Sequence, residues 1–200
     1  MEINKELIAE TAINILNRGG IGSLTMRSLA MELGIKAASL YWHIKSKGEL
    51  YDIVAEKISA GMKPACSMKN AKNYLTETAK LYREKLLRVR DSVEIFMQSA
   101  PVTQERLELI KNCMICLLHM GVSEKNCMIA ANMFNNYILS FVADEMRWNM
   151  LSRERGDSKP EAQEANPFIS VLGQELELMS GEEQFTRGLD VLFAGFKILK

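Results

Sequence analysis

The sequence lacks any apolar run close to the roughly 20 residues that a helix needs to cross a bilayer. Its first residues, Met1–Glu6, do not combine a basic segment with an apolar stretch, so we expect no secretory signal there. Neither sign of charge predominates, because 25 Lys and Arg stand against 25 Asp and Glu. We therefore expect a cytoplasmic protein with no membrane partner, in which any strongly charged surface is local.

Histidine and cysteine are also scarce, with two histidines and four cysteines among 200 residues. The cysteines show no spacing typical of a disulfide framework, and free thiols fit a reducing cytoplasm. We expect no metal site, no cofactor and no catalytic residue. The alternative is a helical thiol enzyme or metal site built from Cys113, Cys116 and His119. Their position within one predicted helix, without a second pair, favours two buried small residues instead.

Strand signals are absent as well, and only four prolines interrupt the chain. Apolar residues recur at intervals of three and four, the period of an amphipathic helix. Ser46 with Glu49, and Ser180 with Glu183, match the capping box that begins a helix. The polar segment 152–167 is predicted to be a loop. We predict an all-α protein with helices over about 5–18, 26–33, 37–43, 46–60, 70–90, a short stretch from 91, 103–120, 124–151 and 182–199.

What the N-terminal part does contain is a local excess of positive charge. A turn with a glycine, Gly34-Ile35-Lys36, joins two short predicted helices, as in a helix-turn-helix. Between residues 18 and 48 there is one anion, Glu32, and there are five cations: Arg18, Arg27, Lys36, Lys45 and Lys47. Clustered cations favour binding to DNA phosphates and argue against a helical adaptor that binds no DNA. We predict a three-helix DNA-binding head over 1–62 and a larger helical domain over 63–200.

The most informative segment is Ser39–Lys47, which reads Ser-Leu-Tyr-Trp-His-Ile-Lys-Ser-Lys. It resembles the end of the recognition helix in the TetR family of repressors, and its Leu-Tyr-Trp-His motif resembles the tetracycline repressors within that family. The resemblance covers about 8–55 closely and continues more weakly to the last helix. It implies a ligand-responsive transcriptional regulator, a repressor that a small organic effector releases from a palindromic operator in double-stranded DNA.

The resemblance also implies roles for individual residues. Thr25, Tyr41 and Lys47 would bind phosphates, and Arg27 would reach a guanine edge. His43 would lie at the backbone or the groove edge, unless it only ends its helix. The implied DNA contacts are Thr25, Arg27, Lys36, Ala37, Ala38, Ser39, Tyr41, His43 and Lys47.

Two features of the recognition segment limit this transfer. Tetracycline repressors carry Gln-Pro where this chain has Ala37 and Ala38. Alanine can contact a thymine methyl group but cannot hydrogen-bond a base edge, so the operator sequence does not carry over. Leu40 and Trp42 are expected to pack against the first and fourth helices rather than to contact DNA.

The resemblance implies a homodimer, and the recognition of a DNA sequence by a short helix predicts one independently. One short helix reads few base pairs, whereas a symmetric pair reads a palindrome with half-sites about one helical turn apart. We expect the interface on the helices at 124–151 and 182–199, where Gly188, Ala194 and Gly195 would permit close approach.

The effector is not expected to be tetracycline with magnesium. The chain has Phe96 and Asn136 where the resemblance would require histidines, and Thr78 and Asn112 where drug contacts would stand. We expect an organic ligand without an obligatory metal in a largely apolar pocket. The predicted lining is Tyr82, Phe96, Ser99, Asn112, Met133, Asn136, Tyr137 and Phe141. Plain core remains the alternative for most of these, while a buried amide at position 112 or 136 would need a partner.

Overall fold

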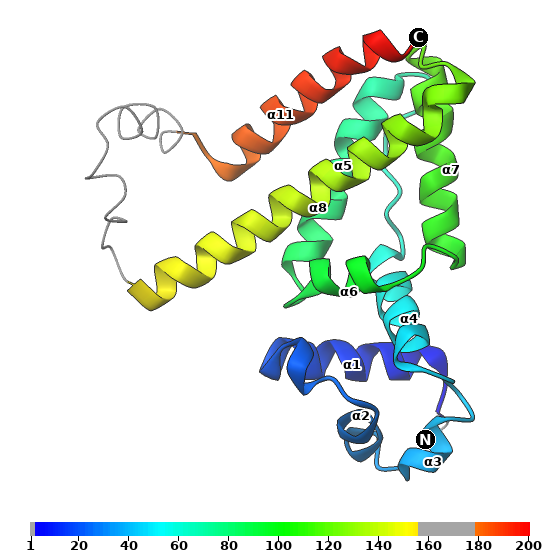
Figure 1. The fold of residues 1–200 in the computed structure, drawn as a ribbon, viewed down its shortest axis with the longest axis vertical. Coiled ribbons are helices and arrows are strands. Elements are labelled where there is room, and N and C mark those ends of the chain that lie inside the picture. The colour runs from blue at the N-terminus through cyan, green and yellow to red at the C-terminus, as the bar shows by residue number, and fades with distance from the viewer. Residues whose placement is uncertain (1–2, 156–178) are drawn as a thin grey trace. The chain divides into compact units, whose positions relative to one another are not determined.

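The computed structural model describes residues 3–155 and 179–200, which form helices joined by short loops (Figure 1). Among these residues there is no β-strand, and no helix is long and apolar enough to cross a membrane. The prediction of an all-α fold is confirmed. The elements are α1 (Lys5–Gly19), η1 (Ile21–Ser23), α2 (Met26–Glu32), α3 (Ala37–Leu40), α4 (Lys47–Ser59), α5 (Ala71–Leu87), α6 (Ser92–Gln98), α7 (Gln104–His119), α8 (Glu124–Arg155), α11 (Gly181–Gly195) and η2 (Phe196–Leu199).

The chain divides into two compact units, Met1–His119 and Met120–Lys200. Within the first unit, α4 packs against α1 on one side and against α5, α6 and α7 on the other. The predicted functional boundary between residues 62 and 63 therefore falls inside one compact unit, and it stays a prediction.

The first four helices form a small head around a shared apolar core. Leu16 of α1, Leu29 of α2, Leu40 of α3 and Leu50 of α4 are all fully buried. Gly34 ends α2 with φ +69°, a left-handed conformation that glycine adopts without a steric penalty. The Ile35 N–H then donates to the Ala30 carbonyl at 3.0 Å, which closes the end of α2 and redirects the chain into α3.

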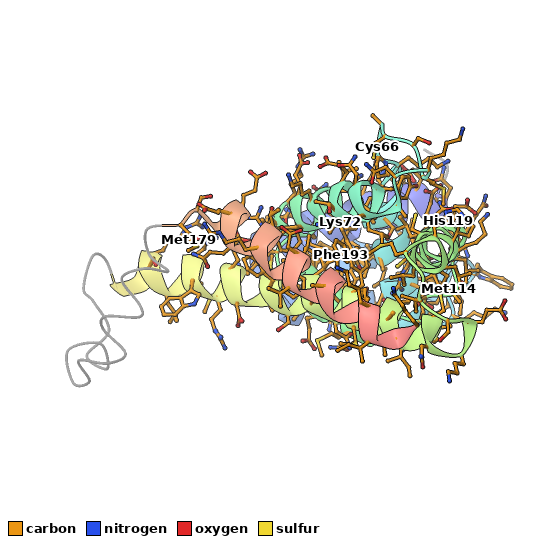
Figure 2. The ribbon with its side chains drawn as sticks, turned by 90° about the horizontal axis from the view of Figure 1, so that it is seen from above. Cys66, Lys72, Met114, His119, Met179 and Phe193 are labelled. Carbon is orange, nitrogen blue, oxygen red and sulfur yellow. The ribbon has the colours of Figure 1, made fainter. Side chains whose placement is uncertain are left out.

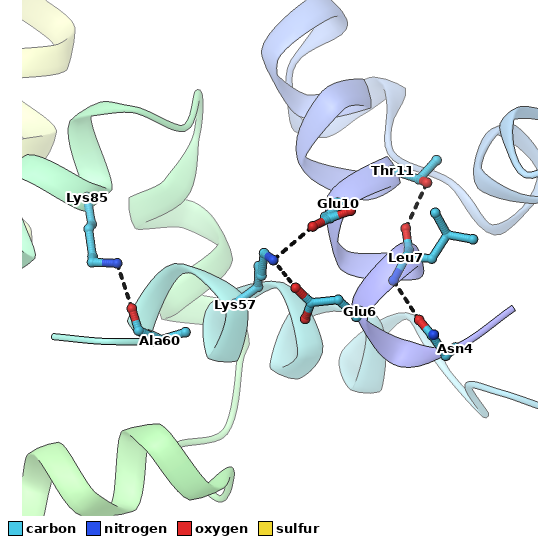
Figure 3. A network of polar contacts seen from close by, with 8 residues as sticks. All are labelled: Asn4, Glu6, Leu7, Glu10, Thr11, Lys57, Ala60 and Lys85. Atoms are coloured by element: carbon cyan, nitrogen blue, oxygen red, sulfur yellow. Dashed lines mark hydrogen bonds and ion pairs between the residues drawn. The ribbon is translucent and has the colours of Figure 1, made fainter.

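Polar contacts fasten α4 to helices on both sides (Figure 3). Lys57 pairs with Glu6 and, at 3.0 Å, with Glu10 of α1. Lys85 of α5 donates to the carbonyl of Ala60, just after the end of α4, at 2.6 Å. Because of these contacts, α4 is tied to the head and to the following helices at the same time.

A second set of hydrogen bonds joins the end of α1 to the turn between α5 and α6. Asp91 adopts a left-handed conformation, with φ 57°, and its carboxylate accepts the Ile21 N–H at 2.7 Å. The Arg90 N–H donates to the Asn17 side-chain oxygen at 2.9 Å. A Cβ at Gly20 would lie 2.7 Å from the Asp91 carboxylate, so this approach requires glycine there.

In the described part of the second unit, α8 packs against α11 and η2. Phe185 of α11 is fully buried and lies against Tyr137 and Phe141 of α8, with ring centroids 5.6 and 5.0 Å away. The Tyr137 hydroxyl donates to the Phe185 carbonyl at 2.8 Å. A Cβ on Gly188 would come within 2.1 Å of that hydroxyl oxygen, so glycine is needed for this packing.

Three predicted boundaries need correction. The helix at 37–43 ends at Leu40, and residues 41–43 continue as a turn in which the His43 N–H donates to the Leu40 carbonyl. Helix α8 runs four residues beyond position 151, so 152–155 are helical rather than a loop, while 156–167 lie outside the described residues. The final helix ends at Gly195 and continues as a 3-10 turn.

Candidate DNA interface and effector site

The recognition segment is anchored by apolar residues and exposes almost everything between them. Leu40 and Ile44 are fully buried in the head. The predicted groove residues 36–39 are all exposed, as are Tyr41 and His43. The prediction that Leu40 belongs to the core is confirmed. The alternative that His43 is the C-cap of this helix is not observed, because α3 ends at Leu40 and Tyr41 occupies the C-cap position.

Trp42 does not pack as the sequence suggested. Its side chain is 89 % exposed, so the prediction that it belongs to the core is wrong. The early end of α3 explains the difference: the turn at 41–43 carries Tyr41 and Trp42 away from the face that holds Leu40. Two neighbouring exposed aromatic rings are costly in water, and they therefore mark this segment as a contact surface.

The positive charges of the head differ in their partners. Arg18 forms an ion pair with Glu32 at 2.7 Å, so these two charges cancel locally. The other four cations of the segment are exposed and form no ion pair with any residue that the structure describes: Arg27, Lys36, Lys45 and Lys47. The ammonium group of Lys47 lies 5.4 Å from the centre of the Tyr51 ring. The unpaired cations can release counterions from a phosphate backbone.

Helix caps fix the backbone around these cations. The Ser46 hydroxyl accepts the Glu49 N–H at 3.1 Å, as predicted, but the Glu49 carboxylate accepts the Lys45 N–H at 2.8 Å instead of completing the box at Ser46. This backbone hydrogen bond is the main reason that the pKa of Glu49 lies below its ordinary value. Thr25 caps α2, its hydroxyl accepting the Ser28 N–H at 3.0 Å. A phosphate contact by Thr25 would share that hydroxyl.

Of the predicted effector residues, three come together in the first unit. The rings of Tyr82 and Phe96 lie 5.4 Å apart, and Ser99 ends the helix that carries Phe96. Burial raises the pKa of Tyr82, which therefore stays protonated. Asn112 lies apart from these three, on α7, where its side chain is close to Tyr74 and Glu108.

In the second unit the predicted residues have different environments. Tyr137 and Phe141 are partly buried against Phe185, and the Tyr137 hydroxyl is already engaged by a carbonyl. Met133 and Asn136 are exposed. The reason given for Asn136, a buried amide that needs a partner, therefore does not hold in the single chain.

Sequence reasoning overlooked Arg106, in the first turn of α7. Its guanidinium carbon lies 4.9 Å from the centre of the Phe96 ring, and its Nη1 donates to the Ser99 hydroxyl and the Ala100 carbonyl, each at 2.8 Å. Burial lowers the pKa of Arg106, and the negative charges of Asp52 and Glu56 oppose that effect. The sequence did contain one signal: Arg106 stands in the first turn of a predicted helix, where the helix dipole disfavours a cation.

The Cys-x-x-Cys pair has the environment of structural residues. Cys113 and Cys116 are buried, and burial raises the pKa of Cys116 to about 11. So little thiolate at neutral pH makes a poor nucleophile or metal ligand. Cys66 lies on the loop between α4 and α5 and His119 on the last turn of α7 (Figure 2). No cluster of metal-ligating side chains occurs within 3–155 and 179–200.

Comparison with known proteins adds two family matches. Residues 8–54 match the model of bacterial regulatory proteins of the tetR family, and residues 68–199 match the tetracyclin repressor-like C-terminal domain. The class D tetracycline repressor of Escherichia coli is 28 % identical over 202 residues, which cover 98 % of this chain and 90 % of that protein.

Solved structures agree with these matches. BioQ bound to its double-stranded DNA operator has a TM-score of 0.71 at 25 % identity, covering 98 % of each chain. ActR of Streptomyces coelicolor in complex with (S)-DNPA has a TM-score of 0.81, covering 99 % of this chain and 98 % of that one. At 21 % identity, ActR supports the fold alone.

Proposed function

Because the chain belongs to the TetR family of bacterial regulatory proteins, we propose that it represses transcription from a palindromic operator and that a small organic effector releases it. One observation carries the DNA-binding part of this proposal. The recognition segment presents two exposed aromatic rings and a group of unpaired cations, and residues 33–48 include no acidic residue. Such a surface attracts phosphates and can contact base edges.

Each exposed residue then has a role on DNA. Lys47 and the Tyr41 hydroxyl bind phosphates and set the register of the protein on the DNA. Arg27 forms bidentate hydrogen bonds with a guanine. Ala37 and Ala38 face the groove with methyl groups only, which suits thymine methyls. The remaining contacts of the proposal are Thr25, Lys36, Ser39 and His43.

The repressor acts as a homodimer. Exposed apolar side chains on α8, α11 and η2 supply the surface, and burying them in a dimer is favourable. They include Met128, Ile129, Met133, Trp148, Val191 and Ile198. The small size of Gly188 is already required within the subunit, where its missing side chain makes room for Tyr137. Gly195 is the better candidate, since a Cβ there would meet no described atom within 4 Å outside its chain neighbours and the adjacent backbone of its own helix.

Effector binding reaches the DNA through α4. Asp52 of α4 accepts the Ala100 N–H at 2.7 Å, and Glu56 accepts the Glu105 N–H at 3.0 Å. The first bond holds the loop between α6 and α7, which lies beside the predicted effector residues Phe96 and Ser99, and the second holds the first turn of α7. A ligand that moves this loop moves α4, and α4 carries Lys47 at its other end. The hydrogen bond from Lys85 to the Ala60 carbonyl makes α5 a second connection to α4.

The proposal includes an effector without an obligatory metal, no catalytic activity and a cytoplasmic site of action, where the operator DNA lies. The rival thiol enzyme has the weaker support, because the Cys116 thiol is buried and poorly ionised. Replacing Cys113 and Cys116 by alanine separates the two: a repressor keeps operator binding and dimerisation, whereas a thiol enzyme loses its activity.

The direct test is to select duplexes from a random DNA pool with the purified protein. We expect enrichment of a palindrome with half-sites about one helical turn apart. Arg27→Ala should cost about 1–3 kcal/mol in binding and relax the preference at one base pair per half-site. A pool with no enriched sequence would contradict the proposed function. An unchanged sequence preference in Arg27→Ala would remove Arg27 from base reading.

A further inference from the structure

Arg106 is a partly buried cation that forms no ion pair with a described residue, although the carboxylates of Asp52 and Glu56 act on it from a longer distance. Both of its hydrogen bonds use Nη1, which leaves the N–H groups of Nη2 and Nε without an acceptor among the described residues. None of the carboxylates in that part of the chain lies within ion-pair distance of it. Asp52 and Glu56 face it from α4, but both of them accept backbone N–H groups. A partly desolvated charge of this kind is stabilised by an anion that fits its planar fork.

The groups around Arg106 are suited to an aromatic ligand. The buried Phe96 ring lies under the guanidinium, and Tyr82 lies against the same ring. The Tyr82 hydroxyl has no hydrogen-bond partner in the described part of the chain. Because its pKa is raised by burial, this hydroxyl is a donor and not a competing anion. A guanidinium group, a phenol hydroxyl that can donate, and flat apolar rings thus occur together on α5, α6 and α7.

We propose that Arg106 and Tyr82 bind the carboxylate of an aromatic carboxylic acid, and that this acid belongs to the class of effectors. The inference rests on the proposed function and specifies its ligand. A carboxylate is favoured over a phosphate, because its two oxygens match the guanidinium fork in one plane and it brings a single negative charge into apolar surroundings.

The position of Arg106 also connects the ligand to α4. Arg106 holds the Ala100 carbonyl, and Asp52 holds the N–H of the same residue. A carboxylate bound to the Nη2 and Nε groups shares the guanidinium with Ala100 and weakens the hydrogen bonds of Arg106 to this loop. Asp52 attaches the same loop to α4 and Glu56 attaches the first turn of α7, so ligand charge and helix position are coupled through Ala100.

The experiment compares two probes of the same shape, 2-naphthoate and 2-naphthamide, by titration calorimetry with the full chain. We expect the carboxylate to bind the wild type at least about tenfold more tightly than the amide. Arg106→Gln should reduce this ratio to near one, and Arg106→Lys should retain part of it. Lys111→Gln removes a cation from the same helix that pairs with Glu108 and should leave the ratio unchanged.

Tyr82→Phe provides a second, milder variant that removes only a hydroxyl. It should weaken naphthoate binding severalfold and naphthamide binding less, because a neutral amide oxygen accepts a weaker hydrogen bond than a carboxylate. Equal affinities in the wild type, no naphthoate binding at about 1 mM, or a full ratio in Arg106→Gln would each overturn the inference. Binding of the selected DNA without any probe is measured in parallel. Its loss in the wild type contradicts the proposed function, whereas intact DNA binding without a carboxylate preference contradicts only this inference.

Discussion

The salt dependence of operator binding follows from the four cations of the head that form no ion pair. A dimer brings eight such charges to the DNA, and each neutralised phosphate contributes about −0.9 to the slope of log K against log salt. The wild type should therefore show a slope of about −7, and raising salt from about 50 to 200 mM should weaken binding about 20,000-fold. Lys47→Gln removes two charges per dimer, so its slope should be about −5 and its loss about 2,000-fold.

The matched control is the double variant Arg18→Gln with Glu32→Gln. It removes an ion pair of zero net charge, joined at 2.7 Å, from the same head. We expect its slope to equal that of the wild type. Fluorescence anisotropy with a labelled operator duplex measures the slopes. If Lys47→Gln left the slope unchanged, or if the control lowered it as much, the division into paired and unpaired cations would be refuted.

Three further outcomes test other parts of the structure. Leu40→Ala should lower the free energy of unfolding by about 2–5 kcal/mol, whereas Trp42→Ala, at an exposed side chain, should change it by less than about 0.5 kcal/mol in denaturant titrations. The pKa of Glu49 in the folded protein lies below 4.5, so the stabilisation by its carboxylate is complete above pH 4.5 and disappears as the pH falls through the folded pKa. The difference in free energy of unfolding between wild type and Glu49→Gln should therefore shrink in acid. A difference that is independent of pH argues against the hydrogen bond from the Lys45 N–H. Gly195→Trp should give a folded monomer in sedimentation at micromolar concentration, and a persisting dimer would exclude this part of α11 from the interface.

The helices could be predicted from the sequence, because the signals that begin and end a helix are local. Ser46 and Ser180 accept the N–H groups of Glu49 and Glu183, three residues ahead, as the capping pattern predicts. The burial of Leu40 follows from the apolar period of its segment. The exposure of the Trp42 side chain does not follow from that period. It depends on where a four-residue helix ends, and the ends of helices are set by weak competing hydrogen bonds.

The long-range contacts could not be predicted from one sequence. Asp91 and Ile21 are 70 residues apart, and nothing in the local pattern of either residue indicates the other. Gly188 illustrates a different limit: its small size was read as room for a second subunit, whereas the room is used by Tyr137 of the same chain. Arg106 looks like an ordinary exposed arginine until Phe96 and Ser99 are placed beside it.

The strength of the coupling between effector and DNA can be compared with the bonds that α4 makes. A hundredfold loss of operator affinity requires about 2.7 kcal/mol, and DNA must weaken effector binding by the same factor. Hydrogen bonds to a charged group contribute about 1.5–3 kcal/mol each, so the Asp52–Ala100 and Glu56–Glu105 bonds together are large enough to carry this coupling. Asp52→Asn keeps the shape of the side chain but weakens its acceptor, so it should reduce the ratio of operator affinities without and with saturating effector several-fold. The salt slope should stay unchanged, because no cation of the recognition segment is removed. An unaltered ratio with Asp52→Asn and Glu56→Gln combined would mean that the coupling passes through another contact of α4, of which Lys85–Ala60 is the next to test.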